Sequence, residues 1–131
     1  MKRTTEILRV LSKDGITLEG KLDLPQGQQA DKLVIFVNGS GPNTYDNRRD
    51  KGDGTQFLFY DLFAQEFCKR GAAFFRYSTR GCFPSEEAPF YCRIDETAYQ
   101  TYCPNTSVLD LEQWGNFLLE DKRLKGAKIY L

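Results

Sequence analysis

Alternating apolar and polar residues near the start of the chain predict a β-hairpin. Asp14-Gly15 is a strong turn dipeptide, and an alternating run lies on each side of it. The second run has an apolar face and a polar face, formed respectively by Ile16, Leu18, Gly20, Leu22 and Leu24, and by Thr17, Glu19, Lys21 and Asp23. We therefore expect an antiparallel strand with one side buried.

Two further apolar runs predict strands of a different kind. Residues 33–37 and 72–77 are almost entirely apolar, which favours strands covered on both faces in a parallel sheet. Between these runs, residues 55–70 carry a helical apolar spacing, formed by Leu58, Phe59, Leu62, Phe63 and Phe67. Gly71 marks the end of this helix. Strand, helix and strand in this order predict a right-handed parallel crossover.

The remaining segments predict two loops, one more helix and a last strand. Residues 38–54 are polar and residues 82–105 have no clear period, so both are expected to be long loops. Ser107, followed three residues later by Asp110, forms a capping box that predicts the start of a helix. Its apolar face would consist of Val108, Leu111, Trp114 and Leu118. A strand is predicted at residues 127–131.

The predicted last strand has no covering helix and no neighbouring strand after it. One face of the sheet would then lack a layer. Since the sequence shows no internal repeat and no interior boundary, it predicts a single partial domain over residues 1–131. Exposed strand edges recruit other chains, so this fragment is expected to self-associate.

Composition and charge exclude several classes of function. The chain has 131 residues, with 18 basic and 18 acidic side chains and no histidine. A net charge of zero argues against a nucleic-acid partner, which needs a basic surface. Without histidine, the chain itself cannot supply the base of a Ser-His-Asp triad or a His-containing zinc site. No cofactor and no metal are expected.

The amino-terminal residues and the cysteines indicate the compartment. The first 15 residues contain no apolar signal segment, and no run approaches the roughly 18 apolar residues that span a bilayer. We therefore expect a cytoplasmic chain with no membrane partner. Its four cysteines, Cys68, Cys82, Cys92 and Cys103, have no C-x-x-C spacing. Free thiols are favoured over disulfides.

The glycine-rich segment Asn38-Gly39-Ser40-Gly41-Pro42 follows the first buried strand. It is not a dinucleotide fingerprint, because Thr44 stands where a third glycine would be needed, and no Gly-Lys-Ser/Thr of a phosphate loop follows. Two interpretations remain open. The segment is either a tight structural turn or a loop whose backbone N–H groups point into a cleft at the carboxyl end of a strand.

Two other segments have compositions that are found in binding sites. Residues 46–54 are rich in aspartate, but Arg48 occupies a ligand position of a calcium loop, so a solvated charged loop is favoured. The aromatic residues between 83 and 102 either line a substrate pocket or anchor their own loop.

Taken together, several motifs resemble one family. They are D-G-I-T-L-E-G-K-L-D-L-P from Asp14, N-G-S-G-P from Asn38 and F-F-R-Y-S-T-R-G-C-F-P-S from Phe74. This sequence resembles the amino-terminal half of an α/β-hydrolase, in the branch of esterases, acyl-transfer enzymes and serine peptidases that carry H-G-S-G-P after the third strand. The resemblance implies an α/β fold, in which an antiparallel hairpin precedes parallel strands with crossover helices, cut before the nucleophile elbow G-x-S-x-G.

The resemblance also implies roles for particular residues. Gly39 and Ser40 match the oxyanion loop, and the backbone N–H of Ser40 is the implied donor. Arg80, with Gly81 and Ser85, matches a turn in which the arginine is mostly structural. Asn38 stands where the family has histidine, and Ser78 stands where it has aspartate. The nucleophile, acid and histidine would all lie outside this chain.

The predicted function is the amino-terminal portion of a serine hydrolase. The longer parent would transfer the acyl group of an ester, thioester or amide, and its partner would be a small-molecule or peptide acyl substrate. This chain alone is expected to be inactive. The alternative is a non-catalytic truncated relative that acts as a binding or interaction module through its sheet edge.

Overall fold

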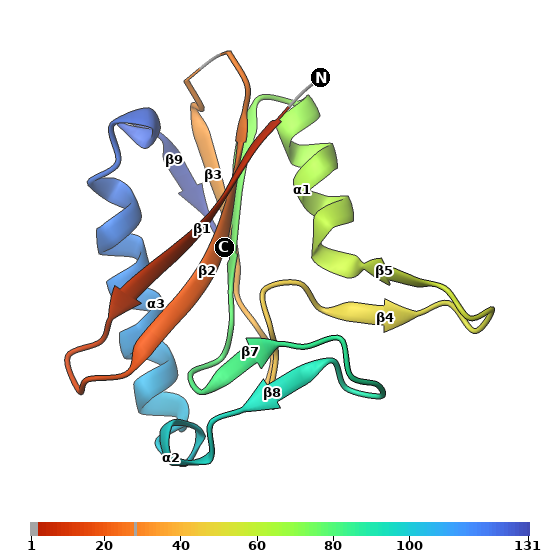
Figure 1. Cartoon of the computed structure of the whole chain (residues 1–131). Helices are drawn as coiled ribbons and strands as arrows, with labels where there is room; N and C mark the ends of the chain where they lie inside the picture. Colours follow the sequence, from red (N-terminus) through yellow and green to blue (C-terminus); the bar gives the residue numbers. More distant parts are fainter. Residues whose placement is uncertain (1–2, 28) are drawn as a thin grey trace.

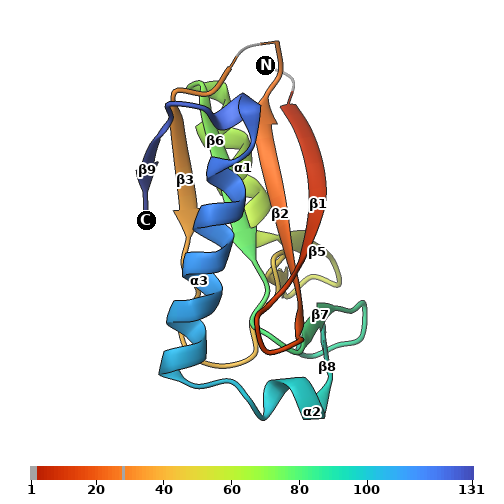
Figure 2. The same cartoon turned by 90° about the vertical axis from the view of Figure 1, so that its left-hand side faces the viewer.

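The computed structural model describes residues 3–27 and 29–131. A five-stranded sheet, in the order β1-β2-β6-β3-β9, lies between helix α1 on one face and helix α3 on the other (Figures 1 and 2). The sheet strands are β1 (Arg3–Leu11), β2 (Thr17–Pro25), β3 (Lys32–Phe36), β6 (Ala72–Tyr77) and β9 (Lys128–Tyr130). The helices are α1 (Phe59–Lys69), α2 (Glu96–Tyr99), α3 (Pro104–Leu119) and the 3-10 turn η1 (Lys122–Leu124).

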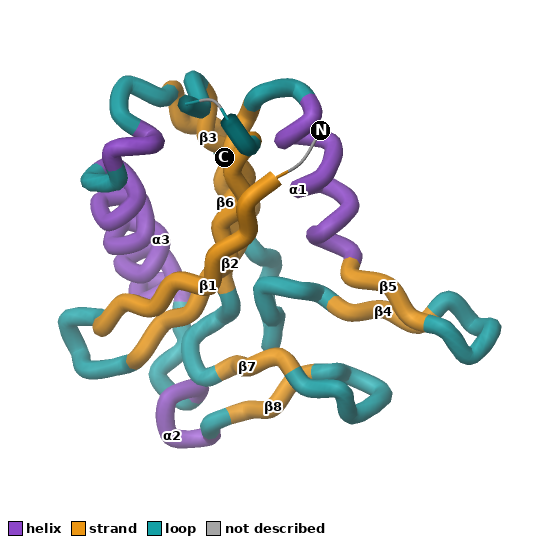
Figure 3. Tube along the Cα trace, turned by 45° about the horizontal axis from the view of Figure 1, so that its top comes forward, coloured by secondary structure: helices purple, strands orange, loops and turns teal. Residues whose placement is uncertain are grey.

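Two small ribbons project from the carboxyl edge of the parallel strands. Strands β4 (Arg48–Asp50) and β5 (Gln56–Leu58) form one antiparallel pair, and β7 (Cys82–Pro84) and β8 (Cys92–Ile94) form the other. Figure 3 shows both ribbons at the end of the molecule where β6 leaves the sheet.

The sheet topology confirms the predicted α/β fold class. Strands β1 and β2 pair antiparallel across the turn that contains Gly15, as the alternation predicted. Strand β3 then pairs parallel to β6 on one side and to β9 on the other. Helices α1 and α3 connect these parallel strands.

Aromatic side chains of β6 build a core on each face of the sheet. Phe75 points toward α3, where its ring centroid lies 4.8 Å from that of Trp114. Phe74 points the opposite way and stacks on Phe67 of α1 at 5.5 Å. Gly20 is required for the first of these contacts, because a β-carbon there would lie 2.3 Å from the Phe75 ring. Because successive side chains of β6 point to opposite faces, this one strand packs against both helical layers.

Strand β6 and its exit form the most buried stretch of the chain. Every residue from 72 to 82 is buried. This run includes two arginines, Arg76 and Arg80, whose residues are 0% and 3% exposed. Buried guanidinium groups need charged partners, and the structure supplies them on both faces of the sheet.

Three predictions about local structure were wrong. Residues 56–58 form β5 rather than part of the helix, since they pair with β4 inside the expected polar loop. Residues 82–105 contain a hairpin and α2 rather than one long loop. Helix α3 begins at Pro104 with Cys103 as its N-cap, so Ser107 lies inside the helix and caps nothing.

The expected polar and apolar faces also contain two exceptions. Asp23 belongs to the predicted solvent face of β2, yet it is 0% exposed because it pairs with Arg76. Val108 belongs to the predicted apolar face of α3, yet it is 64% exposed. Within residues 3–27 and 29–131, no helix has the length and apolar character needed to cross a membrane.

Candidate functional site

The loop of residues 38–42 follows β3 at the carboxyl edge of the parallel strands. Its first residue, Asn38, is fixed from two sides. The Asn38 side-chain amide donates to the Tyr77 carbonyl at 2.6 Å, and the Tyr60 hydroxyl donates to the Asn38 Oδ1 at 3.1 Å. Because Tyr77 ends β6 and Tyr60 belongs to α1, the loop begins at a fixed point between sheet and helix.

Asn43 determines the direction of the peptide groups in this loop. Its side-chain Nδ2 lies 3.1 Å from the Gly39 carbonyl, 3.5 Å from that of Ser40 and 3.2 Å from that of Gly41. The Gly41 N–H donates to the Tyr102 hydroxyl at 3.2 Å. The N–H groups of Gly39 and Ser40 have no acceptor among the described residues. The loop thus has two adjacent N–H donors that are not used in hydrogen bonds among the described residues.

Thr79 connects this loop to the exit of β6. Its N–H donates to the Asn43 carbonyl at 2.9 Å, and its hydroxyl donates to the Gly41 carbonyl at 3.3 Å. The neighbouring Ser78 hydroxyl accepts from the Tyr45 N–H at 3.0 Å. Ser78, which stands where the family pattern has aspartate, therefore stabilises the backbone at Tyr45, just after the loop of residues 38–42.

A cavity of about 140 Å³ lies beside the loop. Gly39 and Asn38 line it from the loop, Tyr77 from β6, and Val108 and Leu111 from α3. Ser40, the next residue after Gly39, is exposed. Burial raises the pKa of Tyr77 to about 12, so its hydroxyl stays protonated at neutral pH. The cavity is small and largely apolar, and its lining also includes the paired Arg80 and Asp110 side chains.

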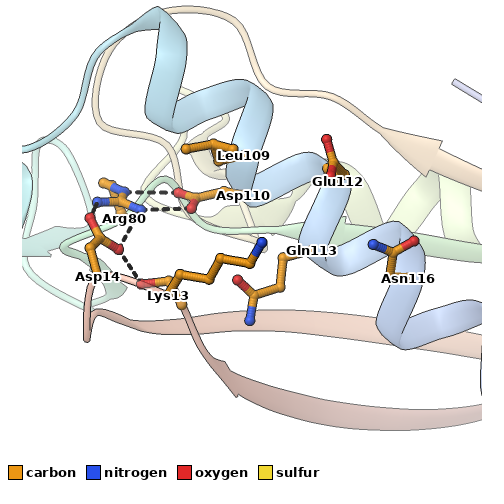
Figure 4. Close-up of a pocket in the computed structure, with 9 residues that line it drawn as sticks. Lys13, Asp14, Arg80, Leu109, Asp110, Glu112, Gln113 and Asn116 are labelled. Atoms are coloured by element: carbon orange, nitrogen blue, oxygen red, sulfur yellow. Dashed lines mark hydrogen bonds and ion pairs between the residues drawn. The ribbon is translucent and has the colours of Figure 1, made fainter.

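Arg80 forms the floor between this cavity and the β1–β2 turn. Its guanidinium makes a two-point contact with Asp110 of α3, at 2.9 and 2.7 Å, and contacts Asp14 at 2.6 and 3.2 Å (Figure 4). The Thr101 hydroxyl accepts a further bond at 2.8 Å. Hydrogen bonds to Asp110 and then to Asp14 raise the pKa of Arg80, whereas burial opposes the rise.

The Arg80 cluster has a structural role. It joins the hairpin turn, the exit of β6 and the first half of α3, and all of its N–H positions face acceptors. The next residue, Gly81, has a φ of +79°, and a β-carbon there would lie 2.6 Å from the Tyr99 nitrogen. Ser85 lies further on, where its hydroxyl accepts from the Glu87 N–H at 3.1 Å.

Figure 4 also shows a second cavity, of about 290 Å³, on the outer side of the Arg80 cluster. It is lined by Ser12, Lys13, Asp14, Arg80, Leu109, Asp110, Glu112, Gln113 and Asn116. Because Asp14 and Asp110 already occupy Arg80, this cavity offers no free guanidinium to an anion.

The sequence predicts Gly39 and Ser40 as site residues but does not indicate the residues that position them. Asn43 gave a weak signal, since asparagine after Pro42 is typical of a turn. Tyr102 and Asp110 gave none, because they lie about 60 and 70 residues beyond the loop. The structure describes no group of three or more acidic or cysteine side chains, over residues 3–27 and 29–131, that could hold a metal ion.

Comparison with known proteins gives structural likeness alone. No protein family matches the chain in sequence, and no curated protein matches it either. Hypothetical protein PA2218 from Pseudomonas aeruginosa superposes with a TM-score of 0.63 and 16% identity, over 98% of this chain and 34% of that one. DcsB, solved in complex with its substrate analogue, gives a TM-score of 0.62 and 18% identity, over 98% and 36%.

A third solved structure is the α/β hydrolase GrgF from Penicillium sp. sh18. It gives a TM-score of 0.48 and 17% identity, over 92% of this chain and 33% of that one. The chain therefore shares its α/β fold with the first two proteins and spans about a third of their length.

Proposed function

We propose that this chain is the amino-terminal portion of an α/β-hydrolase-like serine hydrolase. The parent protein would transfer the acyl group of an ester, thioester or amide, with its nucleophile, acid and histidine outside these 131 residues. In this proposal the loop of residues 38–42 supplies backbone donors to the reaction. The acyl substrate would be a small molecule or a peptide.

The free N–H groups of Gly39 and Ser40 carry the proposal. When a nucleophile attacks an acyl carbon, the carbonyl oxygen becomes negatively charged, and donors that are already oriented stabilise that charge. Asn43 holds the three carbonyls of the loop, so the adjacent N–H groups stay oriented without reorganisation. The low polarity of the neighbouring cavity strengthens such an interaction.

The register of β9 supports the placement of a nucleophile next to this loop. Strand β9 runs parallel to β3, with Tyr130 opposite Val34. Residues that continued this strand would pass Phe36 and then reach the edge where the loop begins. A turn at that point could present a serine hydroxyl to a carbonyl group held by the Ser40 N–H.

The test begins with a protein extended along the coding sequence past Leu131. A fluorophosphonate probe is expected to label the longer protein at a serine outside residues 1–131 and to leave the 131-residue chain unlabelled. Stoichiometric labelling of the shorter, mass-verified chain would place the nucleophile within it and contradict the proposal. A stop codon directly after Leu131 would also contradict it.

The second part of the test separates the Ser40 backbone from its side chain. In the longer protein, Ser40→Pro removes the N–H and is expected to lower turnover by roughly 100- to 1000-fold. Ser40→Ala keeps the N–H and is expected to retain most of the turnover. Circular dichroism first establishes that both variants fold. If a folded Ser40→Pro protein turns over like the wild type, the oxyanion role is wrong.

A binding module is the second candidate function, and the outer edge of β9 favours it. All residues of β9 are exposed, and Ile129 and Tyr130 are 38% and 48% accessible. A cavity of about 330 Å³ beside them is lined by aromatic residues that include Phe63 and Phe67. Such an edge can pair with another strand. Light scattering tests this function, because Ile129→Lys should reduce any self-association if the edge is responsible.

A further inference from the structure

The β7–β8 ribbon brings two cysteines onto one face. Cys82 lies opposite Ile94, and Cys92 lies opposite Pro84. Cys92 and Ile94 are two residues apart, so their side chains point to the same side of the ribbon, and Cys82 shares that side. The two cysteines therefore occupy diagonal positions on one face of the ribbon.

The two thiols differ in their access to solvent. Cys82 is 2% exposed, whereas Cys92 is partly exposed. The neighbouring Cys82 thiol lowers the pKa of Cys92 to about 7, despite the opposing effect of burial. The neighbouring Cys92 thiol, together with burial, raises the pKa of Cys82. The partly exposed Cys92 thiol is thus the more readily ionised of the two.

The other two cysteines lack this arrangement. Cys68 is buried within α1, and burial raises its pKa to about 11. Cys103 is exposed at the N-cap of α3, where hydrogen bonds with Thr106 lower its pKa. Neither is hydrogen-bonded to another thiol within the part of the chain that the structure describes. Cys103 is therefore an exposed thiol that is not paired with a second one among the described residues.

We propose that Cys82 and Cys92 form a reversible redox pair, which a small-molecule disulfide such as oxidised glutathione converts into an intramolecular disulfide. This inference goes beyond the acyl-transfer function and holds whether or not that function is correct. A disulfide requires the two β-carbons to lie roughly 3.5–4.5 Å apart. A ribbon of two three-residue strands can reach this separation by twisting.

The exchange proceeds in two balanced steps. First, the Cys92 thiolate attacks one sulfur of oxidised glutathione, which forms a mixed disulfide and releases one glutathione thiolate. Cys82 then loses its proton and attacks the Cys92 sulfur, which forms the Cys82–Cys92 bond and releases the second glutathione. Two protein thiols are oxidised, and one glutathione disulfide is reduced to two thiols.

The bond would restrain the segment next to the Arg80 cluster. The Cys82 N–H donates to the Thr79 carbonyl at 2.9 Å, and the Asp95 N–H donates to the Gly81 carbonyl at 2.7 Å. Both ends of the closed loop are thus attached to the exit of β6. Closure of this loop restricts the unfolded chain, so the oxidised form is expected to melt roughly 5 °C higher or more.

The experiment uses the 131-residue chain with Cys103→Ser, which removes the exposed competitor. The protein is treated with oxidised glutathione, alkylated and digested without reduction, and the peptides are identified by mass spectrometry. We expect a peptide with Cys82 linked to Cys92, which dithiothreitol separates. With Cys82→Ala added, Cys92 should stop at the mixed disulfide. With Cys92→Ser added instead, the buried Cys82 should remain unmodified.

A rate comparison shows whether the fold is responsible. Because the two cysteines are close in sequence, they can also pair in the unfolded chain. Ring closure in the folded protein is expected to be at least roughly 10-fold faster than in guanidinium chloride. Equal rates, or a folded protein that stops at the mixed disulfide on Cys92, would overturn the proposal.

Discussion

Arg76 and Arg80 lie four residues apart, yet their charges are neutralised in different ways. Arg80 has two carboxylates and a hydroxyl around it, and one of the carboxylates, Asp14, has a side chain that is 48% exposed. Arg76 depends on Asp23, and both of these side chains are 0% exposed. Its Nε also donates to the Tyr45 carbonyl at 3.3 Å.

The difference lies in the number of alternatives that each guanidinium has. The Nη2 of Arg76 is buried without a hydrogen-bond partner among the described residues, and the nearest further carboxylate oxygen, on Asp61, is 3.8 Å away. Arg80 has no such unsatisfied nitrogen. A buried charge with surplus partners tolerates the loss of one, whereas a charge with a single close partner does not.

The largest effect is therefore expected from Asp23→Ala. This change leaves the buried Arg76 charge with only the Asp61 carboxylate, 3.8 Å away, and loss of the close partner of a buried charge typically costs about 3–5 kcal/mol. Urea unfolding measures the loss. A cost below about 1 kcal/mol would mean that Asp61 moves in to replace Asp23, and the contrast between the two arginines would then disappear.

A double variant separates the charge from the packing at this site. Asp23→Leu with Arg76→Met removes both charges, and such replacements of a buried pair are often neutral or stabilising. The double variant should therefore recover most of the stability lost in Asp23→Ala. If it is as unstable as the single variant, the volume of the site rather than its charge explains the cost.

A smaller effect is expected from Asp110→Asn. This change removes the charge at the two-point contact with Arg80 but leaves Asp14 in place. The expected loss is about 2–3 kcal/mol in the same unfolding measurement. A loss equal to that of Asp23→Ala would show that Asp14, being half exposed, offers Arg80 no real compensation.

The smallest effect is expected from Asp14→Asn, and it should depend on pH. Hydrogen bonds from Arg80 and then Ser12 lower the pKa of Asp14 from 3.8 to about 2. A carboxyl whose pKa is lower in the folded state stabilises the protein above its unfolded pKa and loses this effect as pH falls through its folded pKa. The difference in Tm between wild type and Asp14→Asn should thus be constant above pH 4 and shrink toward pH 2.

Measurement of Tm across this pH range checks the assignment. Since other carboxylates also titrate here, the comparison is between the two proteins at each pH rather than between pH values. A difference that stays constant down to pH 2 would contradict the role of Arg80 in lowering the pKa of Asp14.

The larger elements of the fold could be predicted because their signals are local. The turn at Asp14-Gly15, the buried run of residues 72–77 and the helix end before Gly71 all appear where expected. The β4–β5 and β7–β8 ribbons could not be predicted, since strands of three residues are too short to show a period. Asp23 lies on the face of β2 that the alternation predicted. Its burial there could not be predicted, because its partner, Arg76, is 53 residues away in the sequence.

The candidate site shows the same division. Gly39 and Ser40 were proposed from a contiguous motif, whereas the free state of their N–H groups depends on where folding places Asn43, Thr79 and Tyr102. No pattern along the chain encodes that arrangement. It arises because β3 and β6 are neighbouring parallel strands, so the segments that follow them begin at the same edge of the sheet.

The unbroken burial of residues 72–82 has a consequence for how this chain can vary. In a library of random substitutions selected for folded protein, this stretch should retain the fewest alternatives, on both faces of the sheet at once. Most strands admit changes at every second position, because one side meets solvent. Here successive positions contact α1, α3, the Asp23 and Asp110 carboxylates and the backbone near Tyr99. Neither the odd-numbered nor the even-numbered positions can therefore accept substitutions freely.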